Sequence, residues 1–183
     1  MTGAMLAFLA ALLAGVGARD QMLLAGLAAR RFLPPTLLVV AILTAAFAGV
    51  VAAKAAEVLA PLLSPSARVM FAGMAAIVAG LECMVIGPQR TPEEPTRSLF
   101  AAAVVLLVHQ LTDGARFLVF AIAVATAVPT AAALGGAAGG VATVLIGALA
   151  GELLLTGRLR LVRRVIGVVF LAVGAWLVLQ ALH

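Results

Sequence analysis

The stretch "AGVGARDQML", residues 14–23, places Arg19 and Asp20 side by side near the middle of the first long apolar run of the chain. A charged residue at the centre of a membrane-spanning helix costs about 2.5–3.5 kcal/mol on insertion scales, so such residues mark functional positions. The run from residue 3 to residue 29 is otherwise apolar, apart from Gln21. We therefore interpret it as a membrane-spanning segment with a polar centre.

The composition of the whole chain is that of an integral membrane protein. Of its 183 residues, 65% are hydrophobic and only 10% are charged, whereas soluble domains have about 45–50% apolar and about 25% charged residues. The net charge of +5 comes from arginines that lie mostly in short loops, without a basic face that carries interleaved aromatic residues. We expect no nucleic-acid partner. Because no nucleophile–base pair or cofactor motif occurs, we also expect no enzymatic activity and no cofactor.

Six segments are long and apolar enough to cross a bilayer, which takes about 20 residues of helix. Proline, glycine and polar residues separate these segments, and such residues end helices. The predicted spans are 3–29, 36–60, 68–87, 98–127, 130–155 and 161–182. The sequence thus predicts an all-α integral membrane protein with six transmembrane helices.

Arginines alternate between successive loops. Arg30 and Arg31 lie in the first loop and Arg90 and Arg97 in the third, whereas the second and fourth loops contain only Arg68. The basic turn "TGRLRLVRR" forms the fifth loop, with Arg158, Arg160, Arg163 and Arg164. Since basic loops stay in the cytoplasm, we expect both termini to be periplasmic. The Ala- and Arg-rich composition favours a bacterial inner membrane.

The two halves of the chain share a weak internal similarity. Gly73 and Gly167 are 94 residues apart, and so are Gly80 and Gly174, each pair in the third span of its half. The Pro-Thr pairs of "PPTLLVV" and "VPTAAAL" have the same separation. Because three spans make up each half, a duplicated half would insert upside down relative to the first.

We therefore predict two inverted three-helix repeats. The first covers residues 1–89 and the second residues 98–183, with a polar cytoplasmic loop at 90–97 between them. Inverted repeats are typical of secondary transporters, whose substrate site lies near the bilayer midplane where the repeats meet.

The fourth predicted span has a matching polar centre, "HQLTDGAR", residues 109–116. Gln110 and His109 precede Asp113 by three and four residues, so the three side chains would lie on neighbouring rows of one helix. Arg116 follows three residues later and could pair with the carboxylate. Each half therefore places charged and amide groups at about the same depth.

At these two centres the chain resembles the Golgi-type calcium/manganese:proton antiporter family and its bacterial relatives. Each half of those proteins carries one E-x-G-D-[KR]-[ST] motif in its first helix. In the first copy, Gly17 and Arg19 match the glycine and the basic position, Gly15 and Ala18 stand at the acidic positions, and Asp20 replaces the hydroxyl residue. The resemblance covers nearly the whole chain in span count and helix order.

The second copy keeps one acidic residue of the motif. Asp113 matches the aspartate, while Gln110 stands at the glutamate and Thr112 at the glycine. Gly114 replaces the basic residue, and Arg116 follows two positions later. Of the four family acids, only Asp113 remains in place.

The resemblance implies antiport of Mn²⁺ or Ca²⁺ against protons by alternating access, with the ion as cargo. Asp113 would couple ion and proton, His109 would be a second proton carrier, and Asp20 would join Asp113 as a metal ligand. Gln side chains would add oxygens, and the arginines would balance charge or hold an anionic group. The predicted binding residues are Asp113, Gln110, Asp20, Gln21, Arg19 and Arg116, with Glu82, deep in the third span, as an additional candidate.

Two alternatives remain open because three motif acids are missing. The chain could be a transport-inactive homologue that serves as a structural or partner subunit of a membrane complex. It could instead export another small solute, since a charge-balanced centre suits a zwitterion. Asp113 and Arg116 could also form an internal ion pair, and the glutamines could be interhelical hydrogen-bond groups. The expected partners are the lipid bilayer, a small ion or solute, and a second copy or a membrane complex.

Overall fold

The computed structural model describes residues 2–30, 33–85, 98–154 and 158–183. Within these ranges the chain forms helices and no strand. The helices are α1 (Thr2–Gly15), α2 (Arg19–Ala29), α3 (Pro35–Leu59), η1 (Ala60–Leu62), α4 (Pro65–Val85), α5 (Leu99–Leu111), α6 (Gly114–Thr126), α7 (Pro129–Leu149), α8 (Gly151–Leu154) and α9 (Arg158–Ala181). The predicted polar loop at 90–97, with Arg90 and Arg97, lies outside the described residues, as does Arg31.

Four helical stretches are long and apolar enough to cross a bilayer by themselves: α3 with η1, α4, α7 and α9. Two further candidates are bent pairs, in which α1 and α2 meet at 59° and α5 and α6 at 54°. The prediction of an all-α fold is thus confirmed for the described residues, and these contain four to six candidate membrane spans. The first and fourth predicted spans, however, are broken helices.

The first break follows from the glycine in "GVGAR". Gly17 has a φ of +70°, a left-handed conformation that glycine adopts without the steric penalty of a Cβ. Ala18 is then extended and becomes the N-cap of α2. The helix that began at Thr2 therefore stops at Gly15 and restarts at Arg19.

The second break occurs at Asp113, which is extended and is the N-cap of α6. Thr112 ends α5, and its Oγ1 donates a hydrogen bond to the carbonyl oxygen of Val108 at 2.7 Å. Ala18 and Asp113 occupy the same position of the two predicted motif copies. The first and fourth predicted spans therefore break at corresponding positions of that alignment.

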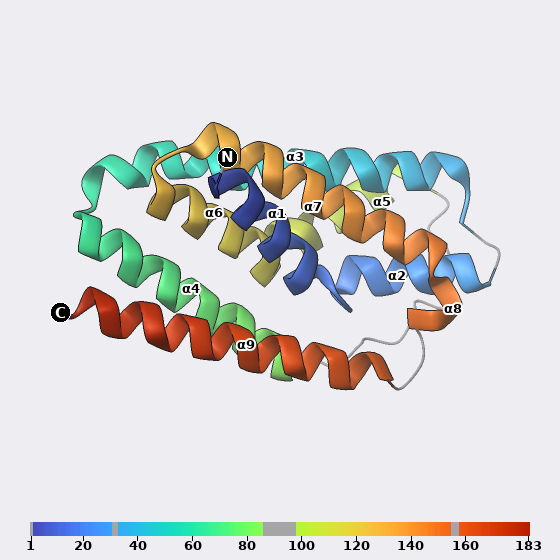
Figure 1. The fold of residues 1–183 in the computed structure, drawn as a ribbon. Coiled ribbons are helices and arrows are strands. Elements are labelled where there is room, and N and C mark those ends of the chain that lie inside the picture. The colour runs from blue at the N-terminus through green and yellow to red at the C-terminus, as the bar shows by residue number, and fades with distance from the viewer. Residues whose placement is uncertain (1, 31–32, 86–97, 155–157) are drawn as a thin grey trace.

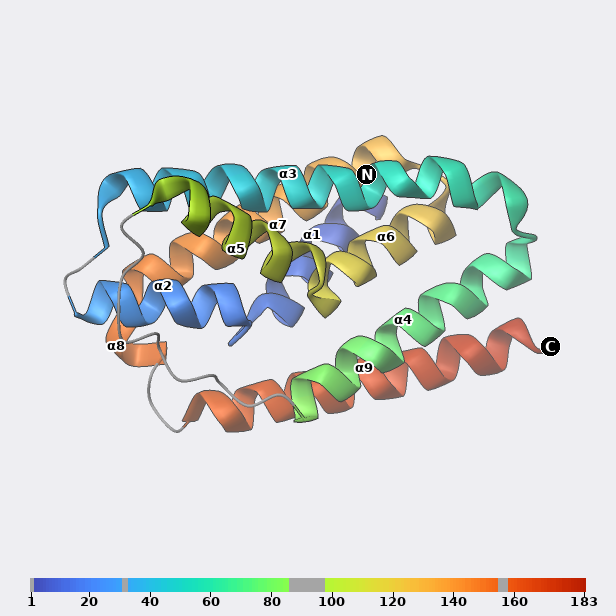
Figure 2. The same cartoon turned by 180° about the vertical axis from the view of Figure 1, so that it is seen from behind.

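Successive spans run in alternating directions, so that α4 is antiparallel to α9 and α3 to α7 (Figures 1 and 2). The helices α4 and α9 lie side by side as a pair on one side of the molecule, and the remaining helices pack together on the other (Figures 1 and 2). The C-terminal end of α9 lies at the end of the molecule that contains the turn between α3 and α4 (Figure 1).

Glycines bring α4 and α9 into close contact in a reciprocal way. A methyl group added at Gly73 would lie 2.9 Å from the carbonyl oxygen of Gly174, and one added at Gly174 would lie 2.7 Å from that of Gly73. Gly80 and Gly167 have the same relation, at 2.8 Å in both directions. Gly73 therefore packs against Gly174, and Gly80 packs against Gly167. The 94-residue spacing relates the same four glycines in the other combination, Gly73 to Gly167 and Gly80 to Gly174.

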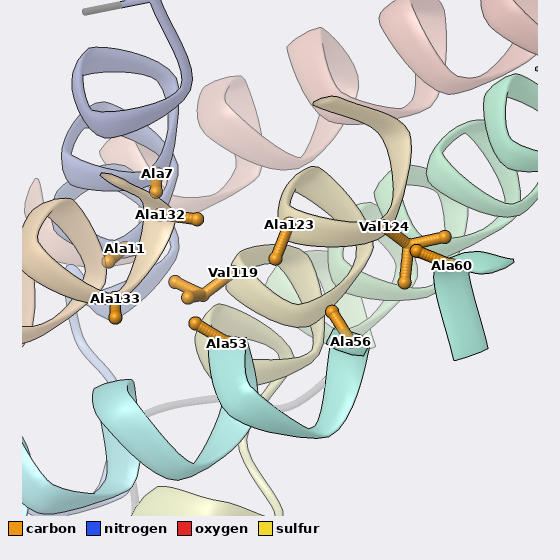
Figure 3. Packing of buried hydrophobic residues seen from close by; sticks show 10 residues of the cluster. All are labelled: Ala7, Ala11, Ala53, Ala56, Ala60, Val119, Ala123, Val124, Ala132 and Ala133. Carbon is orange, nitrogen blue, oxygen red and sulfur yellow. The ribbon is translucent and has the colours of Figure 1, made fainter. Parts of the chain in front are cut away.

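The core between the other helices consists mainly of alanine. Figure 3 shows side chains from α1, α3, η1, α6 and α7 that pack around Val119 and Val124. Small residues allow helix backbones to approach closely, which is the usual way in which helices associate inside a bilayer. Large apolar side chains such as Phe47, Phe100 and Trp176 are instead exposed on the outer surface.

Candidate functional site

Both helix breaks contribute to one small cavity. Its volume is about 10 Å³, which is about the space that a single water molecule needs. The cavity is lined by residues of α2, α4 and α5 and of the junction between α5 and α6: Arg19, Asp20, Glu82, His109, Thr112 and Asp113. Three carboxylates thus converge where the predicted polar centres of the two halves meet.

Two of the carboxylates accept hydrogen bonds from backbone N–H groups in the first turns of α2 and α6, where a helix offers these groups no partner of its own. Asp20 is 5% exposed, and its Oδ1 accepts a hydrogen bond from Gln21 N at 2.8 Å. Glu82 reaches across from α4, and its Oε2 accepts one from Gly114 N at 2.8 Å. A helix N-terminus carries a partial positive charge of about +0.5, so both carboxylates contact helix ends that attract acidic side chains.

Asp113 is held differently. Although it is the N-cap of α6, its side chain accepts no capping hydrogen bond, and the N–H of Gly114 beside it is bound by Glu82. None of the described residues donates a hydrogen bond to the Asp113 carboxylate. Its oxygens are therefore available to a ligand in the cavity.

The expected ion pair between Asp113 and Arg116 is not among the salt bridges of the described residues. Arg116 is 4% exposed, and its Nη2 donates to the carbonyl oxygen of Ala45 on α3 at 3.5 Å. Residues three apart face each other only within a continuous helix. Asp113 is extended and precedes the first turn of α6, so this relation does not hold between Asp113 and Arg116.

The predicted binding residues therefore divide into two groups. Arg19, Asp20, His109 and Asp113 line the cavity together with the additional candidate Glu82. The others are buried outside it, among the helices that cover the breaks: Gln21, Gln110 and Arg116.

Gln21 stabilises the first break. Its Oε1 accepts a hydrogen bond from Gly17 N at 2.6 Å, and its Nε2 donates to the carbonyl oxygen of Thr143 on α7 at 3.2 Å. Gln110, at the end of α5, is only 1% exposed, yet neither of its amide atoms has a hydrogen-bond partner in the described structure. An unpaired buried polar group costs about 1–3 kcal/mol. Both amide atoms of Gln110 are thus unpaired near the second break, whereas the Gln21 amide at the first break is paired and Arg163 there leaves only its Nε unpaired.

Two residues near the breaks were not among the predicted binding residues. Thr112 lines the cavity, and Arg163 bonds to the first break. The prediction that Arg163 lies in a basic loop was wrong, because α9 begins at Arg158. Arg163 is 3% exposed, and its Nη1 donates to the carbonyl oxygen of Val16 at 2.9 Å. The spacing of Leu159, Arg163 and Gly167 at every fourth position places all three on one helix face, a signal that could have located Arg163.

A preformed metal site is not present in the described residues. No group of three or more His, Cys, Asp or Glu side chains in them is arranged to hold a metal ion. Asp20 and Asp113, the predicted metal ligands, line the same cavity as Arg19, whose positive charge opposes the binding of a cation there. Tight metal binding would require the carboxylates to move closer together.

Comparisons with known proteins add no relative. No protein-family model, curated protein or solved structure matches this chain. What the cavity can do therefore follows from its own residues.

Proposed function

We propose that the chain is a secondary transporter that moves a small cation across the membrane in exchange for protons. The observation that carries this proposal is the convergence of Asp20, Glu82 and Asp113 on one cavity at two helix breaks. Transporters bind substrates and coupling ions at such discontinuous helices, because the free backbone groups there are available to the ligand.

A carboxylate can couple the two fluxes because it binds either a proton or a cation. Asp113 is the main candidate, since no described residue donates a hydrogen bond to its side chain. The end of α5 supplies backbone carbonyl oxygens next to it, one of which, that of Val108, already binds Thr112. Protonation of Asp113 would release the cation, and its deprotonation would allow the next one to bind.

The size of the cavity favours an ion over a larger solute. A volume of about 10 Å³ admits about one water molecule and excludes a molecule the size of an amino acid in this conformation. Mn²⁺ and Ca²⁺ are the proposed cargo, because hard divalent cations prefer carboxylate and carbonyl oxygens and because the motif positions resemble those of the antiporter family.

We propose that the two three-helix halves are inverted repeats that alternate access to the cavity. The antiparallel directions of corresponding spans, the reciprocal contacts of Gly73 and Gly80 with Gly174 and Gly167, and the matched N-caps support this proposal. The arginine distribution supports a bacterial inner membrane with both termini in the periplasm.

The test is uptake of Mn²⁺ and Ca²⁺ into proteoliposomes under an imposed pH gradient. We expect wild-type flux to require the gradient and Asp113→Asn to reduce it to the level of empty liposomes. Glu57→Gln is the matched control, because Glu57 is an exposed carboxylate that pairs with Lys54 on α3. Absence of flux from folded wild-type protein would contradict the proposal and favour a transport-inactive partner subunit.

A further inference from the structure

The helices α4 and α9 each make one long-range hydrogen bond to a helix break. Glu82 on α4 accepts from Gly114 N at 2.8 Å, and Arg163 on α9 donates from Nη1 to Val16 O at 2.9 Å. Gly114 is the first residue of α6, and Val16 directly follows α1. The same pair of helices therefore holds both breaks.

The charge of each side chain suits the helix end that it contacts. A helix carries about +0.5 of an elementary charge at its N-terminus and about −0.5 at its C-terminus. Glu82 places a negative charge at the start of α6, and Arg163 places a positive charge at the end of α1. Because Arg163 is 3% exposed, its contact is shielded from water, and such charge-assisted bonds are stronger than neutral ones.

Because they are closely packed, α4 and α9 are expected to move together. The glycines at 73, 80, 167 and 174 leave no room for a methyl group between the two backbones. A shift of one helix would therefore displace the other. Any movement of this pair relative to the rest of the molecule must break or carry along both contacts.

We propose that the Glu82–Gly114 and Arg163–Val16 contacts form a clamp that sets the geometry of the cavity, with Glu82 and Arg163 as positioning residues. Arg163 holds the end of α1 and thereby places Arg19 and Asp20, while Glu82 holds the start of α6 and thereby places Asp113. The clamp does not depend on which solute the cavity carries. It is lost when either contact is removed.

Cys83 provides a reporter for the clamp. It is the only cysteine in the chain, it follows Glu82 on α4, and it is 4% exposed. A methyl group added at Gly167 would lie 3.2 Å from its Cβ, and its thiol is also close enough to Asp113, at the second break, for an electrostatic interaction. Separation of the helix pair from the breaks should therefore loosen the packing around the thiol and expose it to a small maleimide. Intact-mass spectrometry of purified protein in mild detergent measures the rate.

Two variants remove one contact each. We expect Glu82→Ala and Arg163→Leu to raise the rate of Cys83 labelling by roughly tenfold or more, since a hydrogen bond to a charged group is worth about that factor. Arg164→Leu is the matched control, because Arg164 is the next residue of α9 and is exposed. Equal rates in Arg163→Leu and wild type would overturn the clamp, as would an equal rise in Arg164→Leu.

Conservative variants separate the clamp from transport. In Glu82→Gln an amide oxygen can still accept from Gly114 N, so labelling should stay at the wild-type rate even if the loss of charge abolishes cation flux. Arg163→Lys keeps the charge and should also stay near that rate. Fast labelling of Glu82→Gln would overturn the clamp without bearing on the proposed function. If Arg163→Leu does not fold, Arg163→Gln replaces it with the same expected rise.

The double variant tests whether the two contacts act as one unit. If they do, Glu82→Ala combined with Arg163→Leu should label about as fast as the faster single variant, because the first loss already releases the helix pair. A rate equal to the product of the two single effects would mean independent contacts and would overturn the clamp.

Discussion

The two helix breaks occupy corresponding positions of the two halves, yet they differ in how completely their polar groups are paired. At the first break, Gly17 N binds Gln21 and Val16 O binds Arg163. At the second, Asp113 has no donor in the described structure and both amide atoms of Gln110 are unpaired. The difference indicates that the first break supports the structure, whereas the second leaves the Asp113 carboxylate available to a ligand in the cavity.

The largest expected effect separates the two aspartates. Asp113→Asn should abolish gradient-driven cation uptake, because its free carboxylate is the proposed coupling group. Asp20→Asn should lower uptake by roughly tenfold at most, since the amide oxygen can keep the bond from Gln21 N and only one charge-assisted interaction is weakened.

Initial uptake rates in proteoliposomes measure both variants at matched protein content. Equal losses would remove the distinction between the breaks, and a larger loss in Asp20→Asn would reverse it.

The two glutamines should differ in stability. Gln21→Met leaves Gly17 N without its partner at 2.6 Å, and an unpaired buried donor costs about 1–3 kcal/mol. Gln110→Met should be neutral or stabilising, because it replaces an amide that has no described partner by an apolar side chain of similar shape. Thermal unfolding in detergent compares the two, and a lower Tm for Gln110→Met than for Gln21→Met would contradict the contrast.

A smaller effect is expected from the glycines of the two breaks. Gly17→Ala should destabilise by about 1–2 kcal/mol, the cost of a left-handed conformation for a residue with a Cβ. Gly114→Ala meets no such penalty. Its methyl group would lie 2.5 Å from Glu82 Oε2 and 3.3 Å from Cα of Ala79, so it should displace Glu82 from Gly114 N.

Gly114→Ala should therefore raise Cys83 labelling through the lost hydrogen bond, whereas Gly17→Ala should lower the Tm through backbone strain and leave Cys83 labelling near the wild-type rate. An equal rise in labelling in the two variants would show that backbone conformation does not distinguish the two breaks.

Much of the fold could be predicted from the sequence. The bounds of α3, α4 and α9 agree with predicted spans to within three residues, because a long apolar run leaves the chain few alternatives in a bilayer. The predicted span 130–155 is too long, since α7 ends at Leu149. The depth of the site along the spans could also be predicted. Charges such as Asp20 and Asp113 are costly inside apolar runs, and charges at such positions usually mark functional sites. The helix breaks at these charges were not predicted, because the spans were identified from their hydropathy. A straight span and a bent span of the same sequence have the same hydropathy.

What the sequence by itself determined is an all-helical membrane protein with a polar centre in the first span of each half. Only the tertiary structure decided which polar residues share a cavity. It brought Glu82 from α4 to Gly114 and Arg163 from α9 to Val16. It also bonds Arg116 to Ala45 on α3 and not to Asp113. The physical reason is that a helix break redirects side chains that a continuous helix would align, and the free backbone groups at the break then bind charges from helices distant in sequence.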